Sequence, residues 1–369
     1  MRTPRGPVLL LFGVAFGAAL SSAASAWTPA WETTIASTAR TSELRGVCET
    51  GGVVYVLAMA SEKIAEPIPI LYAIRVDSGA TAPAAKTLWK GQRARRAEEM
   101  TNPLCDSTGV SFVLREDKGK PEVVRLDFAG KVLERNPVAI ENFYSAEKWA
   151  AIGKDRKVLA DNRRLFIVDP KGNATELPIP GLDDHETILD LCAFQEGRGF
   201  ALLTMSLAGP AAQLRLRRFD AKPQMTESRA IPGGFGGVSC SPPGDEIQLA
   251  YLDAAAGTIS LARFGPKLAS KPAEPLVAAS VASLGARGLN GRDSTFWTFN
   301  SGMRSRVYEV PGKAAPTLAW AEPDVQRWGT TVNAPAGVMI GGDAILLVME
   351  GIDRSAGGPK VLRVLRLAR

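Results

Sequence analysis

Short apolar segments recur along this chain at a spacing of about 50 residues, and each precedes a run of strand-forming residues. Four of the seven copies end in a cysteine: Gly46-Val47-Cys48, Pro103-Leu104-Cys105, Leu189-Asp190-Leu191-Cys192 and Val238-Ser239-Cys240. The other three are residues 149–152, Gly288-Leu289-Asn290 and Val338-Met339-Ile340. A period of this size in strand-forming sequence is typical of a radially repeated all-β array.

Each repeat continues with alternating apolar and polar positions that end in turn-forming residues. In the first repeat, strands are predicted at residues 53–58, 70–76 and 86–89, after the cysteine segment. Alternation such as Leu214-Arg215-Leu216-Arg217 places one set of side chains on each face of a sheet. Each repeat therefore predicts four antiparallel strands, with the apolar segment as the first.

The two ends of the chain complement each other in this pattern. The last repeat stops at its third strand, residues 361–367, whereas a β-rich segment at residues 31–36 precedes the first repeat. Because ring closure removes exposed sheet edges, we expect the N-terminal strand to pair with the C-terminal strand. The pattern resembles the β-propeller superfamily over nearly all of residues 27–369, which implies seven blades of four antiparallel strands.

No specific propeller family is identified. The repeats lack the Gly-His and Trp-Asp pairs of WD40 blades and the paired glycines of kelch blades. Two β-sandwich domains are an alternative architecture, but they explain neither the even period nor the missing last strand.

The first 26 residues have the pattern of a secretory signal peptide. Arg2 and Arg5 precede an apolar run, and Ala24-Ser25-Ala26 forms a small-residue cleavage site. The run is shorter than the roughly 20 residues of a membrane span, although a retained signal anchor is the alternative. We therefore predict a signal peptide at residues 1–26, a single propeller domain at residues 27–369 without a membrane span, and a periplasmic or secreted location.

The charge of the chain bears on its partners. Its net charge is +6 at pH 7, with one histidine and no block of five like charges. Nucleic-acid binding normally requires a concentrated basic face, so we expect a protein or cell-envelope partner rather than a nucleic acid. No cofactor is indicated.

The four cysteines of an exported chain are compatible with two disulfides in three possible pairings. In a propeller, matching positions on adjacent innermost strands face each other, so the resemblance implies the pairs Cys48–Cys105 and Cys192–Cys240. The alternative is that all four are buried free thiols packed between blades. A metal site built from all four is disfavoured, because they belong to blades on different sides of the ring.

Three blade-to-blade connections carry candidate binding residues on the face that propellers commonly use for ligands. These are the basic group Arg93, Arg95 and Arg96, the run Asp183, Asp184, His185 and Glu186, and the pair Arg327 and Trp328. The arginines suit a carboxylate or phosphate, and the acidic run suits a metal or acid–base site or else a solvated turn. Trp328 is interpreted as a binding anchor or as packing at a blade edge. The glycine-rich segment at residues 233–237 is interpreted as a flexible blade connection.

Catalytic motifs are missing from the sequence. It contains no Gly-x-Ser-x-Gly elbow and no His-Glu-x-x-His, and His185 alone gives little support for a Ser-His-Asp triad. We assign no catalytic residue and no metal site, and expect a non-catalytic binding scaffold that uses its loop face. The alternative is an exported hydrolase or lyase acting on carbohydrate or ester at the channel mouth. The sequence indicates neither the ligand nor the oligomeric state.

Overall fold

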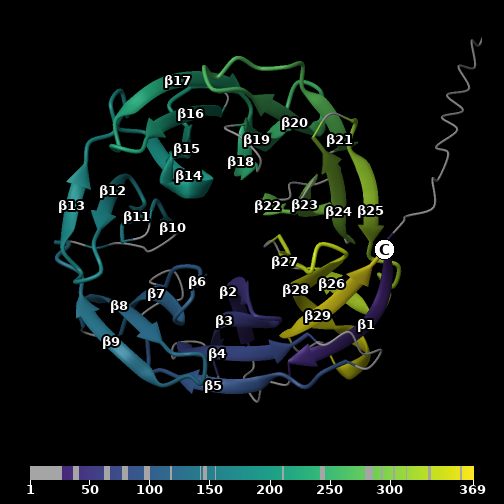
Figure 1. The fold of residues 1–369 in the computed structure, drawn as a ribbon. Helices are drawn as coiled ribbons and strands as arrows, with labels where there is room; N and C mark the ends of the chain where they lie inside the picture. Colours follow the sequence, from purple (N-terminus) through teal and green to yellow (C-terminus); the bar gives the residue numbers. More distant parts are fainter. Residues whose placement is uncertain are drawn as a thin grey trace, which may run out of the picture.

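The chain folds into a ring of seven antiparallel sheets around a central channel, a seven-bladed β-propeller (Figure 1). The computed structural model describes residues 27–35, 41–61, 67–76, 82–94, 100–116, 119–141, 143, 148–153, 155–209, 212–241, 246–278, 286–291, 294–301, 304–312, 314–330, 334–357 and 360–369. The predicted signal peptide lies outside these ranges. The predicted all-β fold with four-stranded blades is confirmed.

The first three blades follow the chain from the innermost to the outermost strand. Blade 1 comprises β2 (Thr41–Thr50), β3 (Val53–Ser61), β4 (Pro67–Arg75) and β5 (Lys86–Lys90). Blade 2 comprises β6 (Leu104–Cys105), β7 (Val110–Arg115), β8 (Pro121–Leu126) and β9 (Val132–Pro137). Blade 3 comprises β10 (Lys148–Ala151), β11 (Lys157–Asp161), β12 (Arg164–Val168) and β13 (Ala174–Leu177).

The next three blades repeat this order. Blade 4 comprises β14 (Glu186–Ala193), β15 (Gly199–Ser206), β16 (Gln213–Asp220) and β17 (Met225–Pro232). Blade 5 comprises β18 (Gly234–Ser241), β19 (Glu246–Asp253), β20 (Thr258–Phe264) and β21 (Glu274–Ala278). Blade 6 comprises β22 (Ala286–Asn290), β23 (Ser294–Ser301), β24 (Arg304–Pro311) and β25 (Thr317–Ala321). Two 3-10 turns, η2 (Gln195–Gly197) and η3 (Arg354–Ala356), lie outside the sheets.

Blade 7 is assembled from both ends of the chain. Its strands are β26 (Trp328–Thr330), β27 (Ala336–Ile340), β28 (Ala344–Asp353), β29 (Lys360–Ala368) and β1 (Thr28–Ile35). The N-terminal strand β1 pairs antiparallel with β29, from Thr28 opposite Ala368 to Ile35 opposite Leu362. The expected ring closure is confirmed, and Figure 1 shows β1 beside β29 at the outer rim. The innermost edge of this blade is divided, because β26 and β27 both pair with β28.

The hydrophobic core lies between neighbouring blades. The second strands are largely buried: eight of the nine residues of β3 and nine of the ten residues of β28 are buried. One cluster joins blades 7 and 1 through residues such as Trp31, Val56 and Val364, and another joins blades 1 and 2 through Leu57 and Phe112. A strand stacked between two other sheets is buried on both faces, which explains its continuous apolar sequence.

Two disulfides join adjacent innermost strands. Cys48 and Cys105 link blades 1 and 2 with a Cα–Cα distance of 5.6 Å, and Cys192 and Cys240 link blades 4 and 5 at 5.5 Å. Both distances lie within the range that a disulfide requires. The predicted pairing is confirmed, and the free-thiol alternative is excluded for all four cysteines.

The glycine-rich segment belongs to a strand rather than to a flexible connection. Gly234 to Gly237 begin β18, the innermost strand of blade 5. A Cβ atom at Gly237 would lie 2.1 Å from the carbonyl oxygen of Ala286, on the neighbouring innermost strand β22. The glycine is therefore explained by close approach of two backbones, so the sequence interpretation was wrong here.

Antiparallel pairing sorts the loops onto two faces of the ring. The loops that join one blade to the next emerge on the same side as the loops between second and third strands. We call this side the loop face, and it includes residues 91–94, 178–185 and 322–327. Within the described ranges, no helix is long and apolar enough to cross a membrane.

Candidate functional site

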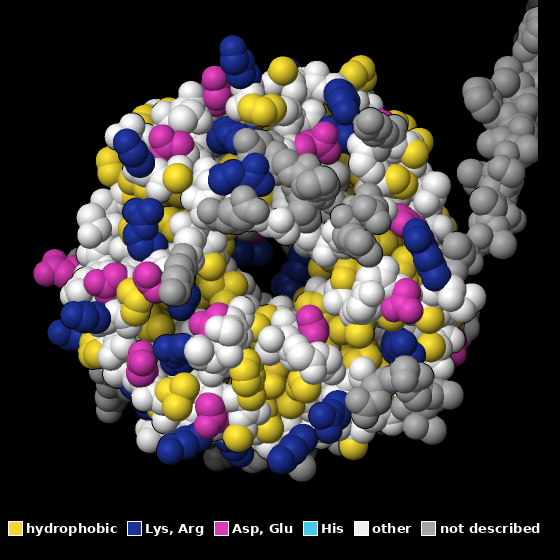
Figure 2. All heavy atoms as spheres, viewed as in Figure 1, with side chains coloured by type: hydrophobic (Ala, Val, Ile, Leu, Met, Phe, Trp, Pro, Cys, Tyr) yellow, Lys and Arg dark blue, Asp and Glu magenta, His cyan; other side chains and the backbone are white. Residues whose placement is uncertain are grey.

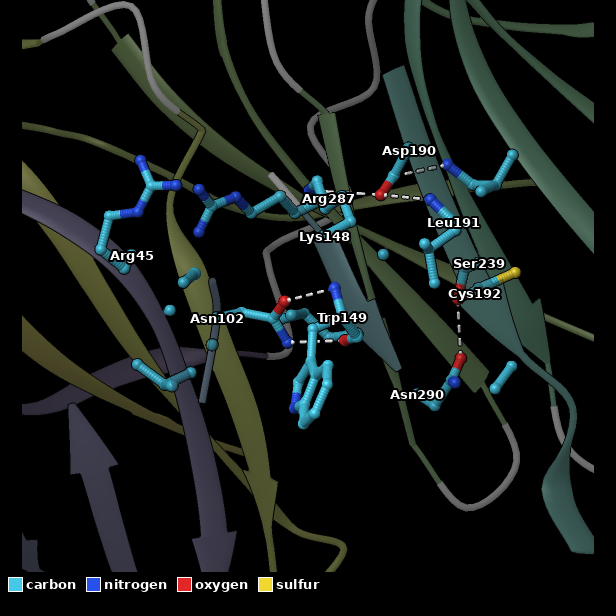
Figure 3. Close-up of a pocket in the computed structure, with 18 residues that line it drawn as sticks. Arg45, Asn102, Lys148, Trp149, Asp190, Leu191, Cys192, Ser239, Arg287 and Asn290 are labelled. Carbon is cyan, nitrogen blue, oxygen red and sulfur yellow. Dashed lines mark hydrogen bonds and ion pairs between the residues drawn. The ribbon is translucent and has the colours of Figure 1, made fainter. Parts of the chain in front are cut away.

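A cavity of about 280 Å³ lies in the central channel, and all seven blades contribute to its wall. Figure 2 shows the opening through the ring, with Lys and Arg side chains on its wall. The charged lining residues are Arg45, Lys148, Asp190 and Arg287 (Figure 3). The three cations each lie in the first half of an innermost strand, Asp190 is the fifth of the eight residues of β14, and those strands start at the loop face. The cations therefore lie on the loop-face side of the cavity, and we call this side the cationic mouth of the channel.

A β-bulge positions the first of these cations. Arg45 is the extra residue where the register of β2 against β3 shifts between Leu44 and Gly46. A bulge redirects a side chain that regular pairing would place elsewhere. The Nε of Arg45 donates a hydrogen bond to the carbonyl oxygen of Met100 at 2.8 Å. The guanidinium is thus held toward blade 2 at the channel wall.

Asp190 organises the opposite side of the mouth. Lys148 Nζ lies 3.2 Å from Asp190 Oδ1, which also accepts a hydrogen bond from the Leu191 amide at 2.9 Å. The other oxygen, Oδ2, accepts from the Val238 amide at 3.0 Å. This carboxylate therefore joins blades 3, 4 and 5 while it holds Lys148 in place.

Arg287 is the third cation and is partly exposed to the channel. In Figure 3 its side chain extends toward Arg45. Burial lowers the pKa of the Arg287 guanidinium, whereas the charges of Asp190 and Glu350 act in the opposite direction. An arginine retains its proton in proteins, so it contributes a positive charge here. Among the described lining residues, three cations face one carboxylate, an arrangement that attracts anions.

The deeper part of the cavity is polar but internally satisfied. Ser239 Oγ donates to Asn290 Oδ1 at 2.8 Å, and Asn290 Nδ2 donates to the carbonyl oxygen of Cys240 at 2.9 Å. Asn102 makes a similar bridge from blade 2 to blade 3, with both of its contacts to the Trp149 backbone at 3.1 Å. These amides replace strand pairing between adjacent blades, so their role is structural.

Of the three arginines in the predicted basic group, only Arg93 lies within the described residues. Arg93 is exposed on the loop face and does not line the cavity. Arg95 and Arg96 lie outside the described residues.

The predicted acidic run divides between surface and interior. Asp183, Asp184 and His185 form an exposed turn, in which Asp183 Oδ1 accepts a hydrogen bond from the His185 amide at 2.8 Å. Glu186 is buried and pairs with Arg217. Across the described ranges, no three His, Cys, Asp or Glu side chains gather as a metal site requires. These four residues do not converge on a common cavity.

The predicted pair at the start of blade 7 is also divided. Trp328 is 2% exposed and packs between two guanidinium groups, with Arg327 4.6 Å and Arg363 3.9 Å from its ring centre. Arg327 itself is about half exposed and lies 3.4 Å from Asp353. Trp328 therefore packs at a blade edge, and Arg327 remains a surface candidate.

Sequence reasoning missed the cationic mouth, although a signal was present. Arg45, Lys148 and Arg287 each stand directly before one of the apolar segments that mark the repeats. Matching positions in a propeller converge on the channel, so aligned basic residues indicate a shared cationic site.

No protein-family model and no curated protein matches this chain. Several solved structures are similar in fold. Virginiamycin B lyase from Staphylococcus aureus aligns with a TM-score of 0.58 and 11% identity over 93% of this chain and 99% of that chain. The Dos1 propeller aligns at 0.54 and 10% identity over 87% and 77%, respectively. The propeller domain of the Trilobed protease from Pyrococcus furiosus aligns at 0.50 and 10% identity over 88% and 95%. At such identities the likeness concerns the fold alone: this chain is a seven-bladed β-propeller.

Proposed function

We propose that this protein is an exported, non-catalytic binding scaffold that engages a protein or cell-envelope component through its loop face. The cationic mouth of the channel is the centre of recognition. The observation that carries the proposal is the convergence of Arg45, Lys148 and Arg287, from three separate blades, on one cavity. Such a site attracts an anionic group of the partner.

Export is supported by two independent features. Residues 1–26 have the pattern of a signal peptide. The chain also carries two disulfides, which form and persist mainly in oxidising compartments such as the periplasm and the exterior of the cell.

A hydrolase or lyase would require other residues in the lining of the cavity. Hydrolysis of a glycosidic bond normally requires two facing carboxyl groups. The described lining residues provide Asp190, whose oxygens contact Lys148 and two backbone amides. The likeness to virginiamycin B lyase concerns fold alone, so binding is the function that the lining residues favour.

Cross-linking in the exporting cell tests the proposal. The wild-type protein is compared with Arg45→Gln/Arg287→Gln and with a rim variant, Arg93→Ala/Arg327→Ala, by quantitative mass spectrometry of captured proteins and envelope components. Trp328 is left intact because it is buried. Lys171→Gln/Lys222→Gln, in two exposed hairpins on the opposite face, also removes two positive charges and is the control for net charge.

We expect a specific partner that the control retains, that the cavity variant loses, and that the rim variant captures less well. An identical set of captured components for wild type and cavity variant would contradict the proposal.

A further inference from the structure

We propose that the cavity at the channel mouth binds a phosphate group held among Arg45, Lys148 and Arg287. This inference rests on the proposed function, because it concerns the same site. It adds the chemical group that the site recognises. The same chemistry is offered by inorganic phosphate, a phosphomonoester or a lipid headgroup.

The charge of the lining favours a doubly charged anion. Three cations and one carboxylate line the cavity among the described residues. Glu350 also acts on Arg287, but it lies behind the wall, where it accepts a hydrogen bond from the Leu44 amide at 2.8 Å and lies 3.9 Å from Lys360. The net positive charge of the residues that line the cavity matches a phosphate dianion better than a single carboxylate.

The two guanidinium groups provide the second argument. The Arg287 side chain extends toward Arg45 across a partly enclosed cavity (Figure 3). An anion between them interacts with both positive charges, and each guanidinium can offer it two N–H donors in a fork. Partial exclusion of water strengthens this attraction.

The donors are also fixed before binding. The Arg45 guanidinium is tied to the Met100 carbonyl at 2.8 Å, and Lys148 is tied to Asp190 at 3.2 Å. Preorganised donors lose little conformational entropy on binding. They come from three different blades, so an oxyanion in the cavity can contact donors on more than one side. The cavity of about 280 Å³ has room for such a group with several waters.

Isothermal titration of the full chain with inorganic phosphate at low ionic strength tests the inference. We expect one phosphate per chain, bound at least about tenfold more tightly than acetate, because a planar monoanion uses fewer charged hydrogen bonds. In Arg45→Met/Arg287→Met, we expect affinity to fall about tenfold or more, whereas Lys171→Gln/Lys222→Gln, which also removes two positive charges, behaves as wild type.

Thermal unfolding gives a second readout. Phosphate should raise the melting temperature of the wild type but not that of the variant. If the double variant does not fold, Arg287→Gln alone serves both measurements.

Three results would overturn the inference: no measurable phosphate binding, equal affinity for acetate, or unchanged phosphate affinity in a folded cavity variant. Glycerol phosphate and vesicles with or without phosphatidic acid distinguish the source of the group once inorganic phosphate binds. If the wild type does not bind phosphate but captures a partner that the cavity variant loses, this inference alone is overturned. Phosphate binding without any captured partner overturns the proposed function alone.

Discussion

Glu186 and Arg217 form a buried ion pair inside blade 4, with 2.6 Å between Glu186 Oε1 and Arg217 Nη1. Both side chains are at most 1% exposed, and Thr204 also donates to the carboxylate. We expect Glu186→Ala to lower the free energy of unfolding by about 3–5 kcal/mol, because it leaves a buried guanidinium without its partner. Denaturant unfolding measures this loss. Asp184→Asn, two residues earlier and fully exposed, should change stability by less than about 0.5 kcal/mol.

The same carboxylate should contribute to acid sensitivity. Burial alone would raise the pKa of Glu186, but hydrogen bonds from Arg217 and Thr204 and the charge of Arg217 outweigh it, so the pKa lies below its ordinary value. A carboxyl group with a lowered folded-state pKa stabilises the fold above its unfolded pKa and loses this contribution as pH falls through the folded value. We expect Glu186→Gln to reduce the slope of stability against pH below about pH 4.3. An unchanged slope in denaturant unfolding at several pH values would contradict this assignment.

Trp328 and Arg327 should separate into a structural and a surface role. Trp328 is buried between two guanidinium groups, so Trp328→Ala should cost about 3–5 kcal/mol of unfolding free energy. Arg327 is half exposed, and its pair with Asp353 should contribute at most about 1 kcal/mol. Comparable losses for Trp328→Ala and Arg327→Ala in denaturant unfolding would argue against this division.

The cationic mouth shows why single residues were harder to predict than strands. Arg45, Lys148 and Arg287 are separated by about a hundred residues or more of sequence, and no local spacing relates them. They meet only because each occupies the same place relative to an innermost strand. The residues of the predicted acidic run separate because β14 begins at Glu186: Asp183, Asp184 and His185 lie in the exposed turn before it, whereas Glu186 is buried at the start of the strand.

At the scale of elements, strands were predictable because their signals are local. Third strands alternate, second strands such as β3 are largely apolar, and the Asp-containing turns mark hairpins. Asp169 confirms this directly, since its Oδ1 accepts hydrogen bonds from the amides of Lys171 and Asn173. The length of the innermost strands was underestimated. Strand β2 has ten residues and β14 has eight, whereas the predicted apolar segments cover three or four.

The disulfides should act as clamps between adjacent blades. We expect Cys48→Ser/Cys105→Ser to lower the free energy of unfolding by about 2–4 kcal/mol, because the bridge closes a loop between residues 57 positions apart. Calorimetry or denaturant unfolding measures the loss. Alkylation of the unreduced wild type, followed by intact-mass measurement, is the control and should label no cysteine. Four labelled thiols in that experiment would remove the basis for this prediction.

At the scale of the whole molecule, every junction between neighbouring blades carries its own link near the channel. Disulfides join blades 1 to 2 and 4 to 5, and polar side chains join the others: Asn102, the Lys148–Asp190 pair, Asn290, Thr298 to the Pro335 carbonyl, and Glu350 to the Leu44 amide. A ring linked in this way resists the opening of any one junction. Its rigidity fixes the seven innermost strands, and with them the three cations of the mouth.

Closure of the ring depends on β1, which is the outermost strand of blade 7 and is remote in sequence from its partner. It contributes Trp31 and Ile35 to the core between blades 7 and 1, and Glu32 forms two contacts with Arg363 at 3.1 and 3.0 Å. A chain lacking residues 1–36 should therefore melt roughly 10 °C or more below one that lacks residues 1–26. It should also associate, because the edge of β29 is left unpaired.

Complementation with a peptide distinguishes loss of closure from general damage. A peptide of residues 27–36 can add to the open edge of β29 in the antiparallel register that β1 occupies. Excess peptide should raise the melting temperature of the shortened chain and restore the size-exclusion elution volume of the longer chain, whereas a scrambled peptide should do neither. If the shortened chain has the melting temperature and the elution volume of the longer chain without peptide, β1 does not close the ring in solution. The ring would then be closed without β1, and the pairing of β1 with β29 would contribute nothing to the stability of the fold.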